Sequence, residues 1–180
     1  MSMIDYIDTW KEVMQKPSDF YRKMPITGGY IEPIVFASVS ATMGAFIHFL
    51  FAPGTDEVKK SIFAVPMIAI IIPFAGILAL FVDATILYII YKMVGGNGTY
   101  EGTAKIVLYS SAASSLIWIP LVGWVFGIYQ VYLYIVGGKF VHGITMERSL
   151  AAVFLFILLL LALGVLIALS GFAPVRSNAF

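Results

Sequence analysis

A chain of 180 residues that is 61% hydrophobic and only 12% charged, with a mean hydropathy of +0.96, has the composition of a membrane protein with several spanning helices. A net charge of +1 gives no basis for nucleic-acid binding, and the absence of cysteine excludes disulfides, thiolate metal sites and cysteine nucleophiles. The length leaves room for one membrane domain.

The first 32 residues are predicted to form a cytoplasmic segment that contains a short amphipathic helix. Pro17 ends this helix or begins another. The helix either lies flat at the membrane surface or packs against the loops of the protein. The segment carries both charge signs and no long apolar run, unlike a secretory signal peptide. The apolar residues that recur at helical spacing are Ile4, Ile7, Trp10, Val13 and Met14.

Residues 33–180 are predicted to form an all-α membrane domain of five spanning helices. The stretch from Leu150 to Leu169 has no charged side chain, and a helix of that length crosses a hydrocarbon core of ~30 Å. The third and fourth spans, which meet at Pro120, are short enough to form a re-entrant pair instead. The predicted spans are 33–51, a part of 61–91 with bends at Pro66 and Pro73, 105–119, 121–136 and 149–170.

The loop charges orient this bundle with the N-terminus in the cytoplasm and, after five spans, the C-terminus outside. Excess Lys and Arg mark the cytoplasmic side of a membrane protein. The inner segments then carry Lys11, Lys16, Arg22, Lys23, Lys92, Lys105, Lys139 and Arg148, and the outer segments carry Lys59, Lys60 and Arg176.

Asp83 is the most unusual residue of the predicted spans, because it lies about 12 Å inside the boundary at Tyr91. A carboxylate at this depth is costly unless it is protonated, paired or hydrated. The residues counted to the same depth are Thr42, Ser114, Ser115, Tyr129 and Gln130. This layer is either a structural hydrogen-bond network or the path of a proton or ion. The fifth span adds nothing polar to it, so we expect that span to be peripheral.

A second candidate site gathers charged residues at the inner ends of the helices. Such residues usually pair and extend toward water, although a histidine can also titrate near neutral pH. His48 lies on the opposite side of the membrane in this topology, so we predict no metal site and no cofactor. No nucleophile occurs with a base and an orienting group, so we expect no enzyme. The candidate residues are Glu32, Lys139, His142, Glu147 and Arg148, with Lys92 nearby.

The glycine-rich loop at residues 95–103 lacks the lysine of a phosphate-binding loop and follows no predicted strand. Its glycines permit a tight inner turn. Thr99 or Thr103 is expected to cap the helix that follows.

The order of several short motifs resembles the Yip domain family, whose members have five spans and are named for interaction with Ypt/Rab GTPases. The resemblance implies a link to vesicle trafficking in eukaryotic members. This chain has a short segment before the first span and no Asp-Leu-Tyr-Gly-Pro stretch, and in both features it resembles prokaryotic members of the family. The resemblance implies that the protein lies in a prokaryotic cell membrane. The matching stretches are Gly95-Gly96-Asn97-Gly98-Thr99-Tyr100, Tyr109-Ser110, Trp118-Ile119-Pro120-Leu121-Val122-Gly123-Trp124, Ile128-Tyr129 and Val141-His142-Gly143-Ile144.

Two functional hypotheses follow from the residues and the resemblance. The first is a membrane scaffold or adaptor that contacts the lipid bilayer and a protein partner at its cytoplasmic face. The second is a small ion or proton transporter or channel that uses the polar layer around Asp83. A further hypothesis, membrane shaping by the amphipathic segment, requires insertion of that segment in the membrane surface. Faces of small residues permit either a homo-oligomer or packing within one chain.

Overall fold

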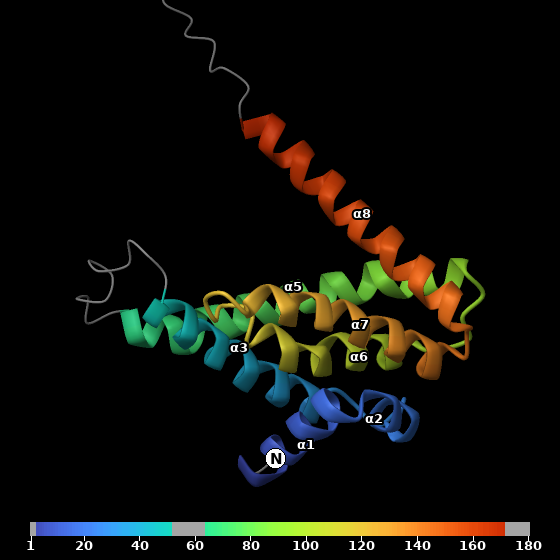
Figure 1. Ribbon diagram of the computed structural model, residues 1–180, viewed down its shortest axis with the longest axis horizontal. Helices are drawn as coiled ribbons and strands as arrows, with labels where there is room; N and C mark the ends of the chain where they lie inside the picture. Colours follow the sequence, from blue (N-terminus) through green and yellow to red (C-terminus); the bar gives the residue numbers. More distant parts are fainter. Residues whose placement is uncertain (1–2, 52–63, 172–180) are drawn as a thin grey trace, which may run out of the picture.

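The computed structural model describes residues 3–51 and 64–171, and every element of regular structure in these ranges is a helix (Figure 1). The all-α prediction is therefore confirmed for this part of the chain. Lys59, Lys60 and Arg176, the basic residues of the predicted outer segments, lie outside the described residues. The helices are α1 (Met3–Gln15), α2 (Pro17–Lys23), α3 (Ile31–Phe51), α5 (Ala64–Met93), α6 (Tyr100–Ser114), α7 (Gly123–His142) and α8 (Met146–Gly171).

Helices α3, α5, α6 and α7 pack as a bundle in which each helix runs opposite to the one before it (Figure 1). The start of α3, the end of α5, the start of α6, the end of α7 and the start of α8 therefore lie at one end. We call this the near end, and we call the end with the α6–α7 connection the far end. The connection to α8 at the near end lets α8 project away from the bundle (Figure 1).

Within the described residues, four helices are long and apolar enough to cross a membrane, and they lie in α3, α5, α7 and α8. Helix α6 is not one of them, because its 15 residues rise only about 22 Å. It nevertheless lies at the centre of the bundle, with every residue from Gly102 to Ala113 buried against α3, α5 and α7. The chain is thus an integral, multi-pass membrane protein whose central helix is short.

Helix boundaries follow from local sequence. Pro17 is the first residue of α2, so the predicted break in the amphipathic segment is confirmed. Thr99 caps α6, and its Oγ1 accepts a hydrogen bond from the Gly102 amide at 3.1 Å. Because of this cap, α6 begins at Tyr100 rather than near Lys105, where the third span was predicted to start.

The other long helices also begin or end beyond their predicted limits. Helix α7 continues to His142, where Gly143 adopts the left-handed conformation that ends many helices, with φ of 63°. Helix α8 begins at Met146 instead of Ser149. Helix α5 passes through Pro73 as one helix of 30 residues.

Helices α1 and α2 pack on the bundle on the side away from α8 (Figure 1). Of the two placements predicted for the amphipathic segment, the structure supports packing against the protein, and the partners are helices rather than loops. The hydrogen bonds that hold α1 run from Trp10 Nε1 to Ala112 O (3.2 Å), between the hydroxyls of Tyr6 and Ser40 (3.1 Å), and from the Tyr129 hydroxyl to Met14 O (2.6 Å).

Tyr21 holds α2 against α6 through burial and hydrogen bonding. Its side chain is 2% exposed, and its hydroxyl lies 2.9 Å from Ser110 Oγ on α6. The Tyr21 hydroxyl also donates to Ile106 O at 3.4 Å, the same carbonyl that accepts from Ser110 Oγ at 2.7 Å. Burial raises the pKa of Tyr21 far above its ordinary value of 10.0, so this donor stays protonated.

Helix α8 contacts the bundle only along its first half. Ala152, Val153 and Phe156 are buried against α7 and α5, whereas every residue from Leu161 to Ser170 is exposed. The expectation that the fifth span is peripheral is confirmed.

Candidate functional site

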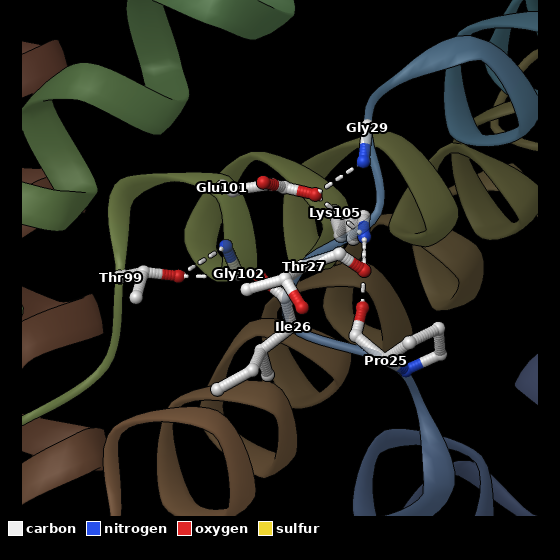
Figure 2. Close-up of polar contacts among 8 residues, drawn as sticks. All are labelled: Pro25, Ile26, Thr27, Gly29, Thr99, Glu101, Gly102 and Lys105. Carbon is white, nitrogen blue, oxygen red and sulfur yellow. Dashed lines mark hydrogen bonds and ion pairs between the residues drawn. The ribbon is translucent and has the colours of Figure 1, made fainter.

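A buried lysine fixes the segment between α2 and α3 at the near end. Lys105 lies in the second turn of α6 and is 3% exposed. Its Nζ donates hydrogen bonds to Pro25 O at 2.8 Å and Thr27 O at 3.1 Å, and it lies 2.9 Å from Glu101 Oε1 (Figure 2). An ammonium has three N–H donors, so all three are used. We call these contacts the lysine clamp.

Glu101 extends the clamp from the preceding turn of the same helix face. It accepts a hydrogen bond from the Gly29 amide at 2.7 Å, and Thr99 donates one to Ile26 O at 3.3 Å (Figure 2). The bonds from Lys105 and Gly29 hold the pKa of Glu101 below its ordinary value of 4.5, so the carboxylate is charged at neutral pH. The first turn of α6 therefore binds residues 26–29.

The clamped segment forms a wall of an open cavity of about 540 Å³ at the near end. Lys105 contributes to the wall, but its donors are already used by the clamp. Tyr109 also lines the cavity, and it lies close enough to Glu32 for the two groups to interact electrostatically. Within the described part of the chain, Glu32 forms no ion pair, so its carboxylate is the unbalanced charge of the cavity. The lining residues are Met24, Pro25, Thr27, Gly28, Gly29, Ile31, Glu32, Pro33, Lys105 and Tyr109.

His142, the predicted titratable residue of the inner-face site, is buried at the near end and 1% exposed. Its Nε2 lies 2.8 Å from Thr103 Oγ1, and that hydroxyl lies 3.1 Å from Thr99 O. Both contacts are satisfied when Thr103 donates to the carbonyl and Nε2–H donates to Thr103. The Nδ1 atom is then an acceptor, and it has no hydrogen-bond partner in the described structure.

The glycine-rich loop closes over the His142 ring. A Cβ added at Gly96 or at Gly98 would lie 2.8 Å from His142 Nδ1, closer than side chains pack. The Asn97 amide between them donates to His142 O at 2.9 Å. The glycines are therefore required by the close approach of the loop to the ring, and not only by the turn that the sequence predicted.

The structure brings four of the five predicted inner-face residues together at the ends of α7 and α8. His142 lies beneath the loop, while Lys139, Glu147 and Arg148 are exposed around it. Lys139 attracts Glu147 electrostatically, and an Arg148 Nη atom lies 3.5 Å from the Cβ position of Gly95. The fifth residue, Glu32, lies apart in the cavity beside the lysine clamp.

The predicted intramembrane residues do not form one hydrogen-bonded layer in the described structure. The three small hydroxyl side chains bond to carbonyl groups of their own helices, and Gln130 Nε2 donates to the Tyr134 hydroxyl at 3.1 Å. Tyr129 bonds to α1, as described above. The hydroxyl contacts are Thr42 to Ser38 O (2.9 Å), Ser114 to Ser111 O (2.9 Å) and Ser115 to Ala112 O (2.7 Å).

Asp83 is half-buried on α5 and makes no hydrogen bond or ion pair within the described residues. It lies close enough to Tyr134 on α7 to interact with it electrostatically. Ser114 and Ser115 instead line a cavity of about 230 Å³ between α3, α5 and α6, together with His48, and Asp83 does not line that cavity.

Sequence reasoning missed the lysine clamp, because it counted Lys105 only as a charge of an inner loop. A signal was available, since Glu101 and Lys105 are four residues apart and so share a helix face. In residues 3–51 and 64–171 no three His, Asp or Glu side chains are grouped so as to hold a metal ion. The arrangement at the near end is suited to binding, because it combines a preformed cavity, a buried imidazole and exposed charges.

The comparison with known families decides which proteins this chain is related to. The family model described as the Yip1 domain matches residues 11–169. The chain belongs to the Yip1 domain family. The matched region includes the lysine clamp, the Glu32 cavity and His142, and it confirms the resemblance seen in the motifs. The chain matches none of the curated proteins and none of the solved structures.

Proposed function

We propose that this Yip1 domain protein is a non-enzymatic, five-span membrane scaffold that binds a partner protein at the cytoplasmic, near end of its bundle. The observation that supports this most is the fixed geometry of the near-end loops. The loop over His142 is bonded to the end of α7, and the lysine clamp bonds the N-terminal segment to α6. Lys92, Lys139 and Arg148 are exposed on this surface. A preorganised surface loses little conformational entropy on binding.

The five-span part of the proposal depends on α6. Although it is short, α6 packs between helices that each meet the length and composition of a span. The turns after Ser114 carry the chain on toward the far end before α7 begins at Gly123. The surplus of Lys and Arg on near-end segments favours the cytoplasm for that end, even with Lys105 buried in the clamp.

Cysteine labelling tests this topology cleanly, because the chain has no cysteine of its own. Asn97→Cys at the near end and Leu121→Cys at the far end place the probe at exposed positions. We expect a membrane-impermeant maleimide to label position 97 only from the cytoplasmic side and position 121 only from the outside. Labelling of both positions from one side would support a re-entrant α6–α7 pair and refute five spans.

Photo-crosslinking in native membranes tests the scaffold role. We expect a photoreactive residue in place of Asn97 to form a discrete adduct, and the same probe at Leu121 to form none. Arg148→Glu should strongly weaken the adduct, while Lys11→Glu on the exposed face of α1 serves as the matched charge-reversal control. Because eukaryotic members of the family are linked to Rab GTPases and trafficking, a small GTPase is one partner class to test. An adduct of twice the protein's mass would instead identify a homo-oligomer.

The alternative, a proton or ion transporter in a prokaryotic cell membrane, is favoured by one observation: the half-buried Asp83 has no hydrogen-bond partner within the described residues. Flux into liposomes that contain the purified protein distinguishes the two functions. The transporter hypothesis expects a flux that Asp83→Asn abolishes and that Asp8→Asn on α1 leaves intact. The scaffold proposal expects no flux above protein-free liposomes from any of the three proteins.

A further inference from the structure

We propose that the cavity beside the lysine clamp binds the headgroup of a lipid with a primary ammonium, such as phosphatidylethanolamine, through Glu32 and Tyr109. This site is separate from the partner-binding surface proposed above, so either proposal can fail without the other. The position of the cavity, its unbalanced charge and its shape all favour such a headgroup.

The cavity lies at the depth of lipid headgroups. Ile31 begins a candidate membrane span that continues to Phe49, and it is 80% exposed. Glu32 follows directly, so its carboxylate lies where the apolar part of α3 begins. A cavity at such a boundary is reached by a lipid from the side and by water from the end of the bundle.

The charge of the cavity selects a cation. Lys105 and Glu101 neutralise each other at 2.9 Å, and the remaining donors of Lys105 are taken by two backbone carbonyls. The clamp therefore has no free donor for an anion such as a phosphate. Glu32 has no ion pair within the described residues, which leaves the cavity with one negative charge beside the phenol of Tyr109.

The number of acceptors matches a primary ammonium. Such a group carries three N–H donors, and the two carboxylate oxygens of Glu32 with the hydroxyl of Tyr109 provide three acceptors. A trimethylated headgroup has the same charge but no N–H donor, so it cannot form these bonds. The ring of Tyr109 also attracts a cation through its face.

The size and remaining lining of the cavity suit a lipid better than a free amine. Its volume of about 540 Å³ lies in the usual range for small-molecule sites, which is roughly 300–1,000 Å³. Met24, Ile31 and Pro33 give it an apolar side that can contact the glycerol backbone and the first carbons of the chains. The headgroup of one lipid thus contacts the polar residues of the cavity, and the apolar part of the same lipid contacts its apolar residues.

Native mass spectrometry of the full chain in detergent, titrated with single lipids, tests the proposal. We expect phosphatidylethanolamine to bind roughly tenfold more tightly than phosphatidylcholine of the same chains or than phosphatidylglycerol, because charged hydrogen bonds contribute about that factor. Glu32→Gln should remove this preference, and Tyr109→Phe should reduce it.

The matched control is Glu147→Gln. Glu147 is the second residue of α8, as Glu32 is of α3, and it is exposed at the same end without lining the cavity. This variant should keep the full preference. Equal binding of the three lipids, or a preference that survives Glu32→Gln, would overturn the proposal. Complete competition by millimolar free ethanolamine would show an amine site with no lipid selectivity, and it would overturn the lipid assignment.

Discussion

Helices α6 and α8 are opposites in both composition and position. Helix α6 contains glycine, threonine, serine and a lysine, and it is buried in the centre of the bundle. Helix α8 has no charged residue from Leu150 to Ser170, and its second half is exposed (Figure 1). In a bilayer, exposed surface contacts hydrocarbon, so apolar character identifies the surface rather than the core. Small and polar residues identify the core, because they allow close packing and hydrogen bonds between helices.

The largest difference in the free energy of unfolding is expected when one leucine in each helix is replaced by alanine. Leu108 on α6 is 1% exposed, and Leu166 on α8 is 64% exposed. We expect Leu108→Ala to lower the free energy of unfolding by about 2 kcal/mol or more, through lost packing and a residual cavity. Leu166→Ala should change it by less than about 0.5 kcal/mol. Unfolding by sodium dodecyl sulfate in mixed micelles measures both, and equal losses would contradict the contrast.

Lys105 tests whether the polar core of α6 stabilises the fold. Lys105→Met leaves the partly exposed Glu101 and two backbone carbonyls without their donor, and the loss of a partner by buried polar groups costs about 1–2 kcal/mol. Lys92→Met, at the exposed end of α5, is the matched control and should be neutral within about 0.5 kcal/mol. The same unfolding assay applies, with limited proteolysis to detect release of residues 24–30. Unchanged stability and proteolysis in both variants would refute the structural role of the clamp.

Two glycines test the same contrast between buried and exposed helix positions, because each substitution by alanine adds a single methyl group. A Cβ at Gly138 on α7 would clash with Ser149 Oγ and lie 2.6 Å from the Tyr91 ring, whereas a Cβ at Gly164 on α8 meets nothing within 4 Å. We expect Gly138→Ala to cost about 1–3 kcal/mol by overpacking. Gly164→Ala should be neutral or stabilise the helix by up to ~1 kcal/mol. Thermal unfolding in detergent distinguishes them, and a tolerated Gly138→Ala would show that α7 and α8 can separate there.

The smallest expected effect is a dependence on pH. Because the pKa of Glu101 is lower in the folded protein than its ordinary value of 4.5, its stabilising contribution is complete above that value and is lost as the pH falls below it. Hydrogen exchange at Gly29 should therefore become faster between pH 5 and pH 3, after correction for intrinsic rates. Glu101→Gln should remove this dependence. A profile identical in the two proteins would assign the effect to another group.

The sequence predicted the helices, the break at Pro17, a cap at Thr99 or Thr103 and the peripheral α8, because each depends on local propensity or on hydropathy alone. It did not predict the burial of Lys105, since a charged side chain near a helix end usually extends into water. Burial here requires carbonyls from residues 25 and 27, which only the tertiary fold brings to α6.

The arrangement of the polar intramembrane residues was beyond sequence reasoning for a different reason. Counting residues from a helix end gives the depth of a side chain but not its direction around the helix axis. Ser114 and Gln130 were counted to similar depths, yet Ser114 lines the cavity beside His48 while Gln130 bonds to Tyr134 on its own helix. Four of the inner-face residues lie together because a short loop joins the end of α7 to the start of α8.

The long-range bonds of α1 and α2 have a consequence for biogenesis. The residues of α6 that hold the N-terminal segment, from Lys105 to Ala112, are made at least 78 positions after their partners. The bond between Lys105 and Thr27 spans 78 residues, and the bond between Trp10 and Ala112 spans 102. At translation rates of roughly 5–20 residues per second, the segment waits several seconds before its binding face exists. During that interval its apolar side has only the bilayer surface or a chaperone to cover it. Helices α1 and α2 therefore dock late, and they can dock only after α6 has been inserted in its native position.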